Sequence, residues 1–117
     1  MYEKMFHNFK YFTILQSISI FYKNTMIAYI SGKILEISET SVTLLPESGV
    51  GYEVGINELT FSKLVLREEA SLYIYHHITE NNQSLFGFET LEEKKLFTEL
   101  LKISGIGGKV GLQILML

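Results

Sequence analysis

The chain has 117 residues, of which 47% are hydrophobic, and a formal net charge of −3. This length allows one ordinary domain, or a small domain with part of another. The chain contains no cysteine, which excludes a disulfide scaffold, thiol catalysis and a Cys-ligated zinc site. No stretch reaches the roughly 18 uncharged apolar residues that a membrane-spanning helix needs, so we expect a cytoplasmic protein that makes no membrane contact.

Residues 1–25 differ in composition from the rest of the chain. They hold 7 of the 15 aromatic residues, and three lysines against one glutamate give them a net charge of +2. Lysines ahead of an apolar run are a feature of secretory signals. However, Glu3 lies among those lysines, polar residues interrupt the run, and no small-x-small cleavage site follows. We therefore interpret residues 1–25 as an N-terminal extension and not as a signal peptide.

Residues 26–88 have the pattern of short strands separated by turn residues. Asn57 is expected to cap a short helix, and Gly32 to mark a bulge or a barrel corner. Five strands with one short helix between them predict a small closed or nearly closed barrel. The expected strands are residues 26–37, 41–45, 52–56, 71–78 and 83–88.

The pattern changes to helical spacing at Thr90. Thr90 and Glu93 fit a capping box, in which the hydroxyl and the carboxylate satisfy reciprocal backbone donors. An apolar stripe follows at helical spacing, formed by Leu96, Phe97, Leu100 and Leu101. Ser104-Gly105 is expected to end this helix. In the next helix, Gly111 should allow a close helix contact, and the residues expected on the inward face are Val110, Ile114 and Leu117.

The segment between these two helices is the strongest candidate for a binding site. Glycine has no Cβ, so the turn can adopt a positive φ and backbone amides can approach a ligand closely. Those amides lie at the start of a helix, where unpaired N–H groups and the helix dipole attract an anion. We interpret the segment as a helix-hairpin-helix that binds DNA phosphates, with a glycine-rich hinge as the alternative. The candidate residues are Ser104, Gly105, Ile106, Gly107, Gly108 and Lys109.

The charge distribution restricts where nucleic acid could bind. Phosphate neutralisation supplies much of the affinity of a DNA-binding protein, yet residues 26–117 carry 7 Lys and Arg against 12 Glu, a net of −5. Residues 100–117 contain Lys102 and Lys109 and no acid. Any surface that binds nucleic acid must therefore be confined to a small part of the chain, such as residues 100–117.

Two other groups of residues were considered as sites. His76 and His77 with Glu80 could suggest a metal ion, but adjacent strand residues point to opposite faces and zinc needs three or four converging ligands. We expect neither a metal nor a cofactor. Four strand tyrosines could form a base-stacking platform, although we prefer a core or interface role for them; they are Tyr29, Tyr52, Tyr73 and Tyr75.

Catalytic patterns are not found in the sequence. It has no Ser-His-Asp order, no Walker A loop and no paired catalytic carboxylates, so we expect the chain not to be an enzyme.

Taken in chain order, these motifs resemble the RuvA family, the Holliday-junction-binding subunits of the bacterial branch-migration complex. Each motif is unspecific, whereas the combination is specific. The matching segments are residues 26–27, 49–54, 85–88, 93–101 and 105–109. The resemblance implies a mainly β and then α chain: a small five-stranded OB-type barrel in residues 26–88, followed by a partial helical domain in residues 89–117 that contains the first helix-hairpin-helix.

The resemblance also implies a function and partners. Family members are homotetrameric, non-catalytic scaffolds that bind four-way junction DNA in recombination and repair and work with an ATP-driven motor subunit. The family has a second helix-hairpin-helix and a motor-binding domain, which have no counterpart here. We therefore expect a C-terminally truncated member whose residues 1–25 precede the family start. A general single-strand-binding OB fold and a protein-only self-assembly module remain alternatives.

In the family, an acidic hairpin tip near the tetramer centre repels phosphates and helps to separate strands. The resemblance places this pin at Glu80 and Asn81. The family commonly has two acids here, and Asn81 is neutral, so the electrostatic steering should be weaker but present. From the residues alone, Glu80 and Asn81 are better explained as good turn formers.

Overall fold

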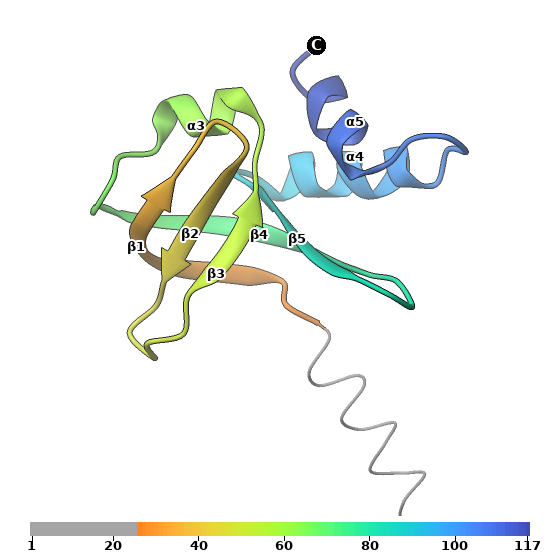
Figure 1. Ribbon diagram of the computed structural model, residues 1–117. Helices are drawn as coiled ribbons and strands as arrows, with labels where there is room; N and C mark the ends of the chain where they lie inside the picture. Colours follow the sequence, from red (N-terminus) through yellow and green to blue (C-terminus); the bar gives the residue numbers. More distant parts are fainter. Residues whose placement is uncertain (1–25) are drawn as a thin grey trace, which may run out of the picture.

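The computed structural model describes residues 26–117 (Figure 1), so the expectations for residues 1–25 lie outside the described residues. β2 and β5 have the expected bounds, and each other strand differs from its expected bounds by one to three residues at one end. The elements in chain order are β1 (Tyr29–Ile37), β2 (Ser41–Leu45), β3 (Tyr52–Gly55), α3 (Glu58–Lys63), β4 (Glu69–Ile78), β5 (Gln83–Phe88), α4 (Leu91–Leu101) and α5 (Gly108–Ile114).

The five strands form a closed barrel in the order β1-β2-β3-β5-β4. Four of the strand pairs are antiparallel. The barrel is closed by one parallel contact between β3 and β5, where Gly55 lies opposite Phe86. The predicted OB-type barrel followed by helices is confirmed.

The barrel core follows from the alternation of apolar residues along the strands. Successive strand residues point to opposite faces, so every second side chain enters the core while its neighbours face outward. The buried members of this core are Ile30, Ile34, Val42, Leu44, Val54, Ile56, Leu72 and Ile74.

Gly32 does not mark a bulge, so that half of the prediction is wrong, while the alternative of a barrel corner stays a prediction. The register shift in β1 lies between Ile34 and Glu36. Gly32 instead lies where β1 passes close to the end of β2. A Cβ at Gly32 would lie 2.6 Å from the carbonyl carbon of Leu45 and 2.7 Å from the nitrogen of Pro46. Glycine is required here because the nearest atoms belong to the backbone and cannot rotate away.

Asn57 caps α3, as predicted, and also joins the barrel to the helical part. Its Oδ1 accepts a hydrogen bond from the Thr60 N–H at 2.9 Å. Its Nδ2 donates to the Leu112 carbonyl of α5 at 3.4 Å. Asn57 is only 6% exposed, so both ends of its amide are used in a site from which water is largely excluded.

The predicted capping box at α4 is confirmed in part. The Thr90 hydroxyl accepts from the Glu93 N–H at 3.2 Å and donates to the Glu93 carboxylate at 3.1 Å. The expected bond from the Thr90 N–H to that carboxylate is not among the hydrogen bonds of residues 26–117. α4 ends at Leu101 with Lys102 as its C-cap, slightly before the expected Ser104-Gly105.

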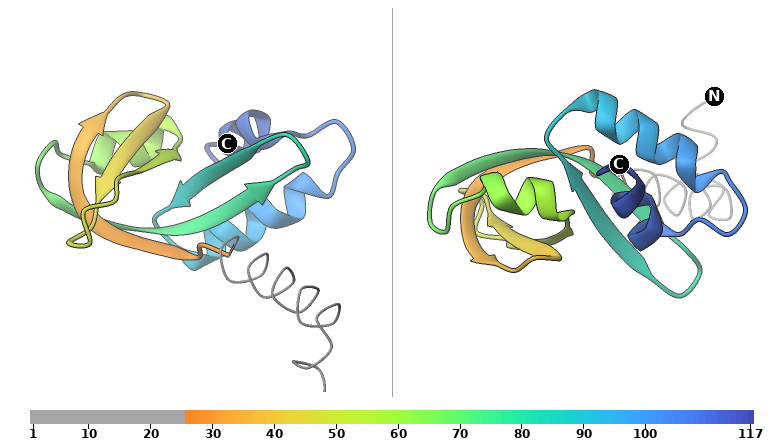
Figure 2. Two further views of the ribbon diagram at one scale, coloured as in Figure 1. Left: turned by 60° about the horizontal axis from the view of Figure 1, so that its bottom comes forward. Right: turned by 90° about the horizontal axis from the view of Figure 1, so that it is seen from above.

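A second, aromatic core attaches the helices to the outer face of the β4–β5 hairpin (Figure 2). Its centre is Phe97 of α4, which is fully buried. The ring centroid of Phe97 lies 4.8 Å from that of Phe88, 5.2 Å from that of Phe86 and 5.5 Å from that of Tyr75. Leu112 of α5 completes the buried cluster.

The inward faces of the helices differ from those predicted. Leu96 is 52% exposed, Val110 is 46% exposed and Leu117 is fully exposed, whereas Gly111 and Leu112 are buried. The reason is the close contact of α5 with Phe97. A Cβ at Gly111 would lie 3.0 Å from Cε1 of Phe97, so the glycine face of α5 turns inward. The predicted close helix contact at Gly111 is confirmed.

We expect Gly32→Ala to lower the free energy of unfolding by about 3 kcal/mol, because overpacking against backbone cannot relax easily. Gly51→Ala is the matched control. A Cβ at Gly51 makes only an ordinary contact, 3.4 Å from Cγ2 of Thr43, and should change stability by less than about 0.5 kcal/mol. Urea denaturation measures both. Equal stabilities of the two variants would contradict the close approach of β1 and β2.

Candidate nucleic-acid interface

The glycine turn joins α4 to α5 through a compact loop. The Ile106 N–H donates to the Ile103 carbonyl at 3.2 Å, which closes the loop. Gly105 has a φ of +89°, in the left-handed region that non-glycine residues rarely adopt. The prediction that a glycine supplies a positive φ in this turn is therefore confirmed at Gly105.

The start of α5 presents backbone N–H groups without a side-chain cap. Its N-cap is Gly107, which has no side chain to accept a hydrogen bond. The first N–H groups of a helix have no intrahelical partner. In α5 the carbonyl of the N-cap, Gly107, accepts a hydrogen bond from the Gly111 N–H at 2.9 Å, so the N–H groups before Gly111 are the ones that could bind a ligand. A Cβ at Gly105 or Gly107 would meet nothing within 4 Å. α5 therefore begins next to two glycines that border open space and without a side-chain cap, an arrangement that suits an anion.

Gly108 has a different role from the other glycines of the turn. A Cβ at Gly108 would lie 2.8 Å from Cε1 of Phe86, and closer still to its Cζ. Gly108 thus lets the start of α5 rest on the β5 ring. The sequence predicts Gly108 as a phosphate-binding residue and gives no signal for this packing role. The two roles are compatible, because its Cα faces the ring while its N–H begins the helix.

Lys109 supplies the free positive charge at this turn. It is exposed and makes no salt bridge with any residue in the described range. Lys102, on the other side of the turn, is bound to Glu99 at 2.9 Å. Both side chains of that pair are about two-thirds exposed, so the pair contributes little to stability, but it offsets the positive charge of Lys102. Lys109 is therefore the stronger candidate for a phosphate contact.

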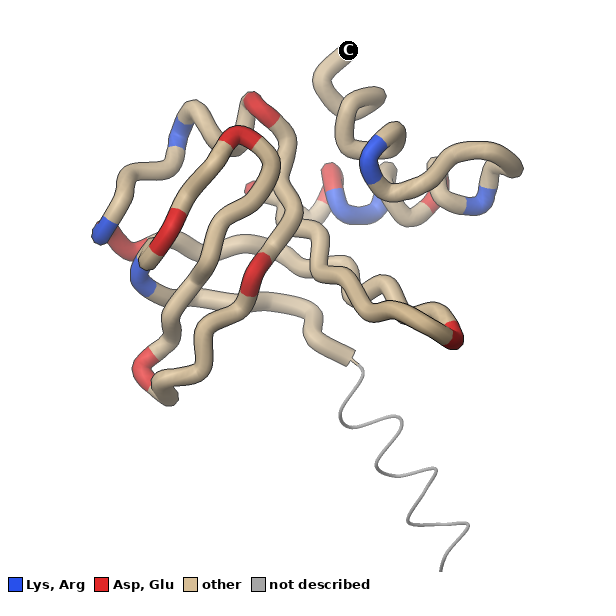
Figure 3. Tube along the Cα trace, viewed as in Figure 1, with Lys and Arg blue, Asp and Glu red and all other residues tan. Residues whose placement is uncertain are grey.

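Glu80 and Asn81 lie at the exposed tip of the β4–β5 hairpin. The Thr79 N–H donates to the Asn82 carbonyl at 2.8 Å and closes the turn. Figure 3 shows an acidic residue at the end of this hairpin. The tip and the glycine turn project from the same end of the molecule in all views of Figures 1 and 2. The fold thus brings the two candidate DNA elements to one end, although more than 20 residues separate them in sequence.

His76 and His77 face opposite sides of β4, as predicted. His76 Nδ1 accepts from the Ile27 N–H at 3.2 Å, and its Nε2 lies 3.1 Å from Oε1 of Gln83. His77 lies on the other face, with its ring centroid 6.3 Å from that of Phe86. The described part of the chain contains no group of three His, Cys, Asp or Glu side chains suited to a metal ion.

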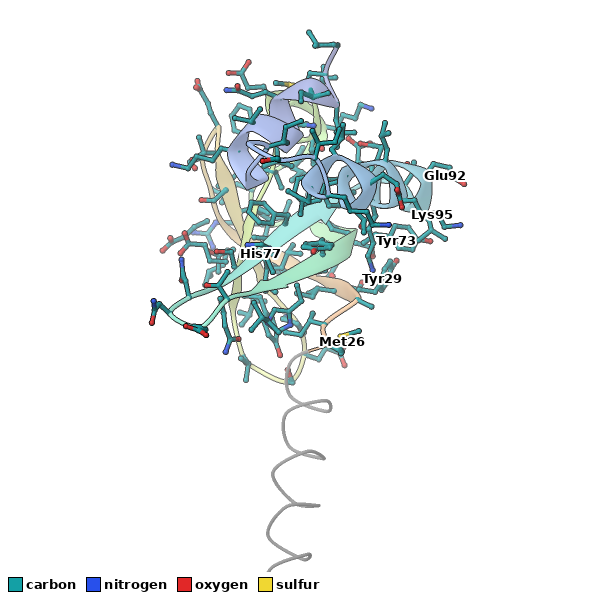
Figure 4. The ribbon with its side chains drawn as sticks, turned by 90° about the vertical axis from the view of Figure 1, so that its right-hand side faces the viewer. Met26, Tyr29, Tyr73, His77, Glu92 and Lys95 are labelled. Atoms are coloured by element: carbon teal, nitrogen blue, oxygen red, sulfur yellow. The ribbon has the colours of Figure 1, made fainter. Side chains whose placement is uncertain are left out.

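The four tyrosines do not form one open platform. Tyr73 and Tyr75 pack against the aromatic core, and Tyr52 packs against the barrel core, so the predicted core or interface role is confirmed for these three. Tyr29 is 52% exposed. Its ring lies edge-on to that of Tyr73, with centroids 5.1 Å apart, below α4 in Figure 4.

A groove of ≈ 880 Å³ lies between the barrel and α5. Lys109 lines its edge near the glycine turn. Other lining residues come from β3, β5 and the segment before β1, including Tyr52, Leu85 and Ile27. Within residues 26–117, no helix has the length and apolar character needed to cross a membrane.

Comparison with known proteins places this architecture in a family. Residues 26–87 match the model of the RuvA N terminal domain. Three relatives carry the name Holliday junction branch migration complex subunit RuvA. The one from Bdellovibrio bacteriovorus is 42% identical over 92 residues, which cover 77% of this chain and 46% of the relative. Those from Oceanobacillus iheyensis and Amoebophilus asiaticus are 42% and 40% identical over 91 residues, covering 77% of this chain and 44% and 46% of the relatives. The chain thus spans about half the length of the curated relatives it matches.

Serine substitutions at the adjacent positions 107 and 108 should have opposite effects on stability, because the first position is open and the second is packed against a ring. Gly107→Ser adds a side chain in open space, at an N-cap whose φ of −94° and ψ of −176° suit serine. It should raise the free energy of unfolding by a few tenths of a kcal/mol, about the measured advantage of a capping side chain over glycine. Gly108→Ser should lower it by about 2 kcal/mol, because the added group collides with Phe86. Thermal and urea denaturation give both values, and a destabilised Gly107→Ser variant would contradict the open geometry.

Proposed function

Because this chain belongs to the RuvA N-terminal domain family, we propose that it is a non-catalytic scaffold that binds four-way (Holliday) junction DNA in recombination and repair. The observation that carries the proposal is the glycine turn, where Gly105 and Gly107 border open space, α5 begins without a side-chain cap, and the exposed Lys109 forms no salt bridge within residues 26–117. This combination suits a phosphate and offers no side chains for reading base edges.

The proposed contact is with the DNA backbone. The amides of Gly107, Gly108 and Lys109 hold a phosphate of a duplex arm, and the Lys109 ammonium neutralises part of its charge. The Ile106 N–H is already bonded to the Ile103 carbonyl and shapes the turn. Such contacts position the DNA and carry no sequence information. Preference for a junction then comes from the shape of the junction. Recognising that shape requires several copies of the turn, held at a fixed spacing.

The charges of the described residues favour a contact confined to this end of the molecule. Residues 26–88 carry 3 Lys and Arg against 8 Glu, a net of −5, whereas residues 89–117 carry 4 Lys and 4 Glu, a net of zero. The barrel therefore repels phosphate, and the helical part does not. One turn makes few phosphate contacts, so binding strong enough to be useful requires several chains acting together. This need for several chains agrees with the homotetramer that the resemblance to the RuvA family implies, and we propose that state.

The acidic tip has a separate role in the proposal. Glu80 is exposed at the end of the hairpin that projects beside the glycine turn. A carboxylate held near phosphates raises their energy and steers the backbones away from the tip. In a junction this keeps the strands apart at the crossover. ATP hydrolysis and the movement of DNA belong, in this proposal, to a separate motor subunit.

Lys109→Ala should weaken binding of the full chain to a synthetic four-way junction by about tenfold at low salt. It should also reduce the slope of log affinity against log salt by about 1 for each bound chain, because one phosphate contact is lost. Lys33→Ala, in β1 of the barrel, is the control that removes the same charge elsewhere. Fluorescence anisotropy over a salt series measures both, and equal behaviour of the two variants would favour a protein-only module.

Glu80→Gln should tighten junction binding at low salt, because a charge that repels phosphate is removed without a change of shape. The gain should disappear at high salt, where the Debye length is only about 3 Å. Glu47→Gln, in the turn between β2 and β3, removes the same charge far from the hairpin and should have little effect. Weaker binding of Glu80→Gln would show that the tip makes an attractive contact instead.

A further inference from the structure

Two hydrogen bonds attach the residues just before β1 to β4. The Ile74 N–H donates to the Ala28 carbonyl at 2.8 Å, and the Ile27 N–H donates to Nδ1 of His76 at 3.2 Å. The regular pairing of β1 with β4 begins after these residues. The position of Ile27 therefore depends on a side chain, and that side chain can change its charge.

The bond from Ile27 selects one form of the His76 ring. A backbone N–H can only donate a hydrogen bond, so Nδ1 accepts with its lone pair and carries no proton. A neutral imidazole then has its proton on Nε2. Nε2 lies 3.1 Å from Oε1 of Gln83, an oxygen that accepts this proton in a hydrogen bond. The neutral ring with its proton on Nε2 thus satisfies both partners.

Protonation of His76 is incompatible with the bond to Ile27. The second proton binds to Nδ1 and turns this acceptor into a donor, which then faces the Ile27 N–H. The bond to Gln83 is kept, because Nε2 remains a donor. Histidine is the side chain that changes charge between about pH 5 and 8. The bond to Ile27 is therefore present at higher pH, where the ring is neutral, and lost at lower pH.

No element around His76 offers the charged ring an ion pair within residues 26–117. Residues 26–28 and the cross-strand partner Leu85 are uncharged, and Tyr75 and His77 point to the other face of β4. None of the titratable side chains that line the same groove forms a hydrogen bond or a salt bridge with His76. These side chains are Glu39, Tyr52, Glu53, Glu58 and Lys109.

We propose that His76 is a pH-sensitive contact that holds the start of β1 against the β4–β5 hairpin. The neutral ring binds the Ile27 N–H, and the protonated ring releases it. Ile27 and His76 both line the groove between the barrel and α5, so release of Ile27 loosens one wall of that groove. This role is independent of the proposed DNA contact at the glycine turn.

The experiment is NMR spectroscopy of the full-length chain without DNA, from about pH 8 to about pH 5. The ring nitrogen signals of His76 report which nitrogen carries the proton, and we expect Nε2 at the upper pH. The protection of the Ile27 amide, corrected for the pH dependence of intrinsic exchange, should fall about tenfold as the ring gains its second proton. The Leu72 amide of the barrel core should stay protected and reports that the chain is folded.

His76→Asn replaces Nδ1 by an amide oxygen that can accept from the Ile27 N–H and does not titrate. This variant should keep the Ile27 amide protected over the whole pH range, whereas His77→Asn should leave the pH dependence unchanged. A proton on Nδ1 at the upper pH would overturn the proposal, as would constant protection of Ile27 while the unmodified ring titrates. An equal loss of protection in His76→Asn would also overturn it. If His76→Asn does not fold, the two measurements on the unmodified chain still decide.

Discussion

The burial of Phe97 is the contact on which the rest of the structure depends. This ring of α4 lies between the outer face of the β4–β5 hairpin, through Phe86 and Phe88, and the backbone of α5 at Gly111. It therefore fixes both helices relative to the hairpin (Figure 2). The glycine turn and the acidic tip share one end of the molecule because the two elements that carry them are packed on the same ring. Loss of this contact would separate the two proposed DNA-binding features without altering either of them.

The glycines in and after the turn have different structural roles, although they are close in sequence. Gly105 supplies a positive φ, and Gly107 leaves the start of α5 uncapped. Gly108 and Gly111 face the opposite way and permit contact with aromatic rings. The same short segment is therefore a packing surface as well as the proposed binding surface. This explains how a helix of only seven residues can be held firmly enough to present its amides in a fixed direction.

The sequence allowed much of this architecture to be predicted, for reasons that are local. Alternating apolar residues define strands, and Asn57 and Thr90 are recognisable caps because their side chains bond to amides three residues ahead. The inward face of α5 could not be predicted, because Val110 and Ile114 lie on one side of this short helix and Leu112 on the other, and the Phe97 contact selects the side. The bond from Asn57 to Leu112 spans 55 residues, and the contact of Gly108 with Phe86 likewise depends on tertiary packing. Neither has a local signal.

In the proposed function, the net negative barrel repels phosphate and the glycine turn attracts it, so the form of the DNA should decide how tightly it binds. The most direct test compares the affinity of the full chain for a four-way junction, a linear duplex and a single strand of matched sequence, from about 50 to 200 mM salt. The account predicts that the junction binds most tightly at every salt concentration, and that affinity falls with salt because phosphates are neutralised. Tighter binding of the single strand would contradict it and indicate a barrel that binds unpaired bases.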